Sequence, residues 1–167
     1  MPSPLSRPRK DDLTMTEMRF DSVADIVAFA ILREIEAAEG YARIGAVAKT
    51  PGLRELAAEL RGQEESHRRL LEELPEETLR ELGTAFVPDL HIVDALPDEK
   101  LSGDMSIQEM LIFSAKKEAQ AVALYESLAR LDGASGRERV FRFLAGQERE
   151  HKLKLEAEYE RQVLQEN

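Results

Sequence analysis

A repeated pattern of metal-binding residue types constrains this chain more than any other feature. The chain carries the segment GQEESH at residues 62–67 and, 84 positions later, the segment GQEREH at residues 146–151. Two upstream residues recur with the same offset: Glu34 and Tyr41 return as Glu118 and Tyr125. Each half therefore contains a glutamate, a tyrosine seven residues later and a Glu-x-x-His motif. Two such halves, folded face to face, would bring four carboxylates and two imidazoles together.

Four segments show the periodicity of amphipathic helices, and the repeated residues lie on their apolar faces. Each segment begins at a helix-start signal: Ser22 with Asp25, Thr50-Pro51, Ser106 with Glu109, and Ser135 with Glu138. Short turns separate the first helix from the second and the third from the fourth, so each pair is expected to form an antiparallel hairpin. Residues 75–105 hold several prolines and glycines but are long enough to traverse a helix of ~37 Å. A short helix is expected there over Glu76–Leu82.

These features predict an all-α fold, a ferritin-like four-helix bundle of two helical hairpins joined by a long crossover. We expect residues 1–20 to be a flexible N-terminal tail and residues 21–167 to form one domain. In that domain the repeated halves are residues 22–74 and 106–166, and the crossover is residues 75–105. A tandem of independent hairpins is the alternative, but the carboxylates of each hairpin would then lack the ligands of the other half opposite them.

Charge and composition exclude several classes of function. A net charge of −10 argues against binding to nucleic acid and against adsorption to anionic membranes. No apolar run approaches the ~20 residues of a membrane span, and the first residues lack the hydrophobic segment of a secretory signal. The absence of cysteine excludes thiolate catalysis and cysteine-ligated iron–sulfur clusters within this sequence. A cytoplasmic location is the default expectation.

The repeated residues form a set of six predicted metal ligands. Residues three apart share one face of a helix, so each Glu-x-x-His motif can present one oxygen and one nitrogen donor. Four glutamates would be costly to bury as anions alone, whereas two divalent ions would balance their charge. The mixed donor set favours two iron ions, or manganese or a mixed pair, over structural zinc. Spacing leaves open which glutamates bridge the metals. The predicted ligands are Glu34, Glu64, His67, Glu118, Glu148 and His151.

Two tyrosines and two alanines follow the upstream glutamates at matched positions. Tyr41 and Tyr125 lie two helical turns after these glutamates, where their hydroxyls could hydrogen-bond to ligand carboxylates or their rings could simply belong to the core. Ala37 and Ala121 lie one turn after the same glutamates, so neither half supplies a further ligand. His91 has no partner at metal-ligand spacing and is predicted to lie on the surface.

The paired Glu…Tyr and Glu-x-x-His motifs resemble the rubrerythrin branch of the ferritin-like superfamily over about residues 20–165. The resemblance implies a non-haem di-iron centre that is oxidised by hydrogen peroxide or dioxygen. In rubrerythrins the two electrons pass to peroxide and give water. The resemblance is also compatible with a homodimer, for which the sequence indicates no interface.

Two departures from the rubrerythrin pattern bear on function. Rubrerythrins usually carry a rubredoxin-like domain whose four cysteines hold an iron that feeds electrons to the centre, and this sequence has no cysteine. The electron donor is therefore expected to be a separate protein or small molecule. Rubrerythrins also tend to have a further carboxylate on the third helix, where this sequence has Ala121. The remaining six-ligand set also resembles the ferroxidase centre of bacterioferritins.

Three functions remain open on the sequence alone. The first is an oxidoreductase of oxidative-stress defence that reduces hydrogen peroxide or dioxygen with electrons from an external donor. The second is a ferroxidase that oxidises Fe(II) for storage or transfer. The third is a non-catalytic metal-binding module.

Overall fold

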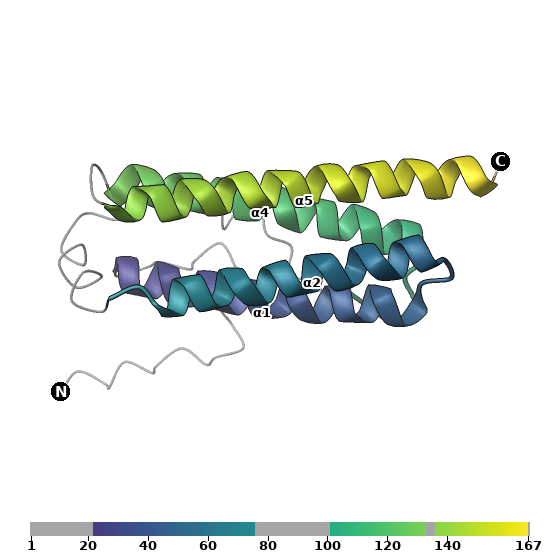
Figure 1. Cartoon of the computed structure of the whole chain (residues 1–167), viewed down its shortest axis with the longest axis horizontal. Coiled ribbons are helices and arrows are strands. Elements are labelled where there is room, and N and C mark those ends of the chain that lie inside the picture. The colour runs from purple at the N-terminus through teal and green to yellow at the C-terminus, as the bar shows by residue number, and fades with distance from the viewer. Residues whose placement is uncertain (1–21, 76–100, 133–135, 167) are drawn as a thin grey trace, which may run out of the picture.

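The computed structural model describes residues 22–75, 101–132 and 136–166, and these residues form four helices and no strand (Figure 1). The helices are α1 (Val23–Val47), α2 (Pro51–Glu72), α4 (Ile107–Asp132) and α5 (Gly136–Glu166). The predicted all-α four-helix fold is confirmed. Five predictions lie wholly or mostly outside the described residues: the tail over 1–20, the crossover over 75–105, the short helix over 76–82, the surface position of His91 and the cap at Ser135.

The first residues of three helices satisfy their free backbone N–H groups as the sequence predicted. The side-chain oxygens of Ser22 and Thr50 accept hydrogen bonds from the N–H groups three residues later, at 3.1 and 3.3 Å, and Pro51 occupies the first turn of α2. Ser106 and Glu109 form a reciprocal capping box, in which each side chain accepts from the other residue's N–H, at 3.2 and 2.7 Å. These caps fix where each helix begins and therefore which residues face the bundle interior.

The four helices form two hairpins that lie one over the other (Figure 1). Helix α1 packs along α2, and α4 packs along α5. The two hairpins meet mainly through α1 and α4, while α2 and α5 approach each other less closely. No helix among the described residues is long and apolar enough to cross a bilayer.

Two apolar clusters fill the bundle and leave a polar layer between them. In α1 the buried residues of the first cluster end at Ala30, and those of the second begin at Tyr41. In α5 the first cluster ends at Ala145 and the second contains Leu155. The turns between these positions carry buried glutamates and histidines. Because apolar packing closes the bundle on both sides of this layer, its charged groups are held together and shielded from bulk water.

Candidate metal centre

The six predicted ligands come together in the polar layer between the two apolar clusters. Helices α1 and α4 contribute one glutamate each, and α2 and α5 each contribute a glutamate and a histidine from one Glu-x-x-His motif. None of these side chains belongs to a residue more than 3 % exposed. Acidic residues are rarely buried so completely without partners, so their shared location itself indicates a binding site.

The six side chains form two overlapping groups, each able to hold one metal ion. The first group is Glu34, Glu64, His67 and Glu148, and the second is Glu64, Glu118, Glu148 and His151. Within each group the potential ligand atoms lie within 4.8 Å of one another. Glu64 and Glu148 belong to both groups, which is the arrangement required of carboxylates that bridge two ions. Glu34 and Glu118 each belong to one group, as terminal ligands would. The geometry thus separates two shared glutamates from two that belong to one group each, a distinction that spacing had left open.

The two histidines have matching surroundings, as the internal repeat implies. His67 Nδ1 lies 2.9 Å from Glu148 Oε1 and 3.2 Å from Glu64 Oε2. His151 Nδ1 lies 2.9 Å from Glu64 Oε1 and 3.2 Å from Glu148 Oε2. The two rings are stacked, with centroids 5.4 Å apart and planes 12° apart. Each imidazole therefore directs Nδ1 toward both shared carboxylates, and each can serve one ion of a pair.

One shared carboxylate makes contacts that suit a cation better than a hydrogen-bond donor. Both oxygens of Glu148 are buried and form no hydrogen bond among the described residues, although each lies close to a histidine Nδ1. Ion pairing with the two imidazoles offsets part of the cost of burying this carboxylate, but the lack of a directed hydrogen bond to either oxygen is still costly. A metal ion bound to the two oxygens would remove that cost, so the residues present fit the metal pair that the sequence predicts.

The four glutamates divide into two kinds by protonation. Burial raises the pKa of Glu34 and Glu118 well above the ordinary value of 4.5, and nearby carboxylates add to the effect. Burial also acts to raise the pKa of Glu64 and Glu148, but close contacts with the two histidines outweigh it and hold both pKa values below 4.5. The terminal positions thus favour neutral carboxyls and the shared positions favour carboxylates when no metal is bound.

The histidines are cationic in the same metal-free state. Burial acts to lower their pKa, but the surrounding carboxylates outweigh it and raise the pKa of His67 to about 11 and that of His151 to about 12. Two imidazoliums then balance two carboxylates. In the metal-free centre, protons on the histidines and on the terminal glutamates offset the negative charge that a metal pair would otherwise neutralise.

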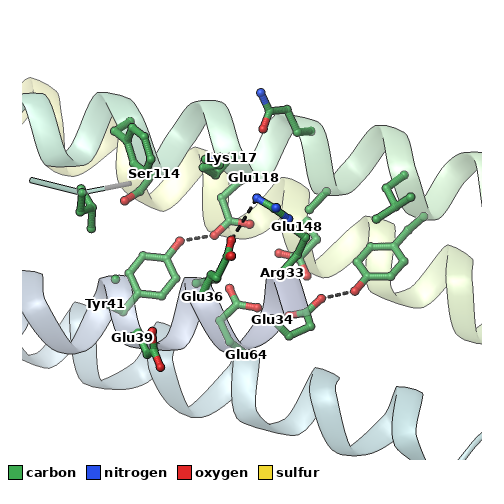
Figure 2. A pocket seen from close by; sticks show the side chains of 18 of the residues that line it. Arg33, Glu34, Glu36, Glu39, Tyr41, Glu64, Ser114, Lys117, Glu118 and Glu148 are labelled. Carbon is green, nitrogen blue, oxygen red and sulfur yellow. Dashed lines mark hydrogen bonds and ion pairs between the residues drawn. The ribbon is translucent and has the colours of Figure 1, made fainter. Parts of the chain in front are cut away.

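The two tyrosines donate hydrogen bonds across the bundle to the terminal glutamates. Tyr41 Oη donates to Glu118 Oε1, which Figure 2 shows, and Tyr125 Oη donates to Glu34 Oε1. A tyrosine two turns along the helix lies ~10 Å from the glutamate of its own half, so it reaches the glutamate of the facing helix instead. Both rings also belong to the apolar clusters. The two roles considered from sequence are therefore compatible.

A glutamine that sequence reasoning did not select also contacts the centre. His151 Nε2 donates to Gln63 Oε1 at 2.5 Å, which fixes the ring so that Nδ1 faces the carboxylates. The signal was present, because Gln63 and Gln147 occupy the same place in the repeated segments. Within the described residues, however, the equivalent contact between Gln147 and His67 is not formed.

A cavity of about 170 Å³ lies between α1 and α4 beside the centre (Figure 2). Its lining includes the four glutamates of the centre, whereas the two histidines lie outside it. Ala37 and Ala121, which supply no further ligand, line the same cavity. The cavity thus reaches the centre from the side of its terminal glutamates, whereas the two histidines are buried and do not line it.

The comparisons with known proteins agree with this geometry. The sequence model of the rubrerythrin family matches residues 25–159, a span that includes both Glu-x-x-His motifs and both tyrosines of the centre. No curated protein and no solved structure matches the chain significantly. The family match covers most of the chain, and the described helices have the bundle and the buried carboxylate–histidine cluster expected of such a protein. The chain belongs to the rubrerythrin family, a ferritin-like di-iron family.

Proposed function

We propose that this chain is a non-haem di-iron protein that reduces hydrogen peroxide or dioxygen with electrons from an external donor. The observation that carries the proposal is the pair of overlapping groups that share Glu64 and Glu148. In the proposed centre Glu34 and His67 hold one iron, and Glu118 and His151 hold the other. Mixed carboxylate and imidazole donors suit iron, and manganese or a mixed pair is the alternative.

Two adjacent redox-active ions can together supply the two electrons that convert hydrogen peroxide and two protons into two molecules of water. The protein's own contribution begins with access, because the cavity between α1 and α4 reaches the terminal glutamates. Apolar packing on both sides of the polar layer excludes bulk water from the centre. This sequence has no cysteine to hold an iron–sulfur group, so we propose a separate one-electron carrier as the donor.

The tyrosines hold protons at the edge of the cavity. Burial raises the pKa of Tyr41 and Tyr125 well above 10, and the carboxylates that accept their hydrogen bonds raise it further. Each hydroxyl therefore keeps its proton and orients a terminal glutamate. Both hydroxyls thus keep the terminal glutamates oriented at the part of the cavity that a bound oxidant would reach.

Charge at the mouth of the cavity favours a neutral molecule over ferrous ion. Arg33, Arg43 and Lys117 line the cavity together with Glu36 and Glu39, so the mouth carries both signs. Arg33 Nη1 and Glu36 Oε2, one turn apart on α1, form an ion pair at 3.0 Å, which Figure 2 marks. A path that concentrated Fe(II) would be expected to be mainly acidic.

Ferroxidase activity is the second candidate, and one observation favours it. Ala37 and Ala121 leave the centre with six predicted ligands, a set that also resembles the ferroxidase centre of bacterioferritins. In that case Fe(II) would be the substrate and Fe(III) the product. A non-catalytic metal-binding module remains the third, and it predicts metal binding without turnover.

The test is to load metal-free protein with Fe(II) without oxygen, remove the excess, count the iron and compare oxidation by peroxide with oxidation by air. We expect two irons per chain and much faster oxidation by hydrogen peroxide. Preference for dioxygen with continued iron uptake would support the ferroxidase. Bound iron that reacts with neither oxidant would contradict both catalytic proposals.

A further inference from the structure

The cavity between α1 and α4 is larger than hydrogen peroxide or dioxygen requires. Its volume is about 170 Å³. A water molecule takes up ~30 Å³ in the liquid, and an apolar cavity of ~150 Å³ in another protein binds benzene. The space beside the centre is therefore sufficient for a small organic group in addition to two oxygen atoms.

Apart from the charged side chains at its mouth, the cavity is lined mainly by apolar side chains away from the centre. Phe29, Phe113, Leu101 and Leu124 line it together with the two alanines. The absence of a side chain at Gly40 allows Leu101 to lie close, because a Cβ at this position would come within 3.1 Å of Leu101 Cδ1. Apolar carbon placed in this cavity would be stabilised by its removal from water.

Polar groups are concentrated at the part of the cavity that meets the centre. The hydroxyls of Tyr41 and Tyr125 point to Glu118 and Glu34 there, and the shared glutamates lie behind them. The cavity thus offers oxygen-binding groups at one part of its surface and apolar carbon at another. A ligand that matches it has a short polar head and a compact apolar tail.

We propose that the cavity binds the apolar tail of a small organic hydroperoxide and directs its peroxide oxygens toward the centre. The inference rests on the proposed reductase function and names a substrate class for the same site. The O–O bond breaks, two electrons from the external carrier protein and two protons are taken up, and the products are one alcohol and one water. The mixed charge at the mouth admits such a neutral molecule, whereas it would retain a strongly charged one.

The first test is binding without turnover. The protein is loaded with redox-inactive zinc and titrated with tert-butanol, the alcohol formed from tert-butyl hydroperoxide, while the methyl signals of its alanines are followed by NMR. We expect saturable shifts of the Ala37 and Ala121 methyl signals in the millimolar range. Shifts that stay linear with concentration, or that fall on other alanines, would overturn the assignment of this cavity.

The second test compares two oxidants on the reduced, iron-loaded protein. The measured quantity is the ratio of the rate with tert-butyl hydroperoxide to the rate with hydrogen peroxide. Ala121→Leu fills the cavity and should lower this ratio about tenfold, the size of effect that a few carbon atoms produce in an apolar pocket. Ala119→Leu is the matched control, because Ala119 is exposed on the same helix, and it should leave the ratio unchanged.

Each outcome separates the two proposals. Wild-type protein that reacts with hydrogen peroxide but not with tert-butyl hydroperoxide would overturn the inference and leave the proposed function standing. Protein whose bound iron reacts with neither peroxide nor with dioxygen would contradict the proposed function, while the tert-butanol titration would still test the cavity. If the Ala121→Leu variant fails to bind two irons, the Ala37→Leu variant, which fills the cavity from the facing helix, is used in its place. An unchanged ratio in the filled variant would overturn the inference.

Discussion

The two sides of the metal centre are built differently, although the chain that forms them is an internal repeat. On the side of α2 and α5 the histidine rings stack, and Gln63 fixes His151. On the side of α1 and α4 a cavity reaches the glutamates, and two tyrosines donate to Glu34 and Glu118. We infer that the histidine side holds the metals in place, whereas the glutamate side receives the oxidant.

The largest expected effect separates the shared glutamates from the terminal ones. Glu148→Gln removes a carboxylate that both groups use, so we expect iron per chain to fall from two to below one after anaerobic loading. The loss of affinity should exceed the roughly 100-fold that removal of an outer partner can cost. Glu118→Gln is the matched control and should retain the ion on His67. Equal iron loss in the two variants, measured by plasma mass spectrometry, would contradict the division of roles.

The pH dependence of stability should differ between the metal-free and metal-loaded protein. In the metal-free protein the pKa values of Glu34, Glu118, His67 and His151 are higher in the folded than in the unfolded chain. Such groups stabilise the fold fully below their unfolded pKa and lose that contribution as the pH rises toward the folded pKa. The loss therefore begins near pH 4.5 for the glutamates and near pH 6.5 for the histidines, and for the histidines it continues to about pH 11 or 12.

The free energy of unfolding falls with rising pH wherever the folded chain retains protons that the unfolded chain has released. We therefore expect the urea midpoint of metal-free protein to fall steadily from pH 6 to pH 9. The shared glutamates have lowered pKa values, so they act oppositely, and their contribution is lost only as the pH falls below about 4.5. Metal replaces the protons, so loaded protein should not weaken over this range. A midpoint that is independent of pH in the metal-free protein would contradict the proposed protonation.

Removal of either tyrosine hydroxyl, which lies on the glutamate side, should have a smaller effect. Tyr41→Phe leaves a buried oxygen of Glu118 without its donor, at a cost of about 1–3 kcal/mol in unfolding free energy. Iron affinity or the rate of oxidation should fall about tenfold, and Tyr125→Phe should behave alike through Glu34. Tyr159→Phe is the control, because Tyr159 packs against the second apolar cluster away from these hydrogen bonds. Thermal unfolding and rapid-mixing kinetics measure the two effects, and no difference from the control would contradict this role.

The smallest expected effect tests the histidine side. Gln63→Met removes the oxygen that accepts from His151 Nε2 and should weaken one iron site several-fold, within the roughly 10–100-fold range for outer partners. The effect is limited because Gln63 is partly exposed and water can replace it. Gln63→Glu keeps an acceptor and should restore affinity. Gln147→Met is the matched variant in the other half and should change little, as anaerobic calorimetry with Fe(II) can measure. An equal loss of Fe(II) affinity in both Met variants would contradict this asymmetry between the halves.

The sequence predicted the helices and the residues of the centre because both follow from local rules. Helical spacing places Glu64 and His67 on one face, and the caps at Ser22, Thr50 and Ser106 set where the helices begin. The shared and terminal roles of the glutamates required the distances between helices. The crossed hydrogen bonds of the tyrosines also depend on which helices face each other. Gln63 was overlooked because its role appears only when α5 brings His151 beside it.

The cavity could not be predicted from spacing, because small residues leave open space only where neighbouring helices do not fill it. Ala37 and Ala121 were recognised from sequence as positions without a ligand. Their second property, space beside the carboxylates, depends on the separation of α1 and α4 and on the position of Leu101 over Gly40. On the glutamate side, the residues with the smallest side chains therefore determine where the cavity lies.

Anomalous X-ray diffraction from crystals of the iron-loaded protein would locate the metal ions themselves. We expect two iron peaks about 3.5–4 Å apart, as in other two-metal sites. One should lie on Glu34 and His67 and the other on Glu118 and His151, with Glu64 and Glu148 touching both. A single peak, or two peaks without a shared carboxylate, would contradict the claim that this repeat builds one bridged metal pair.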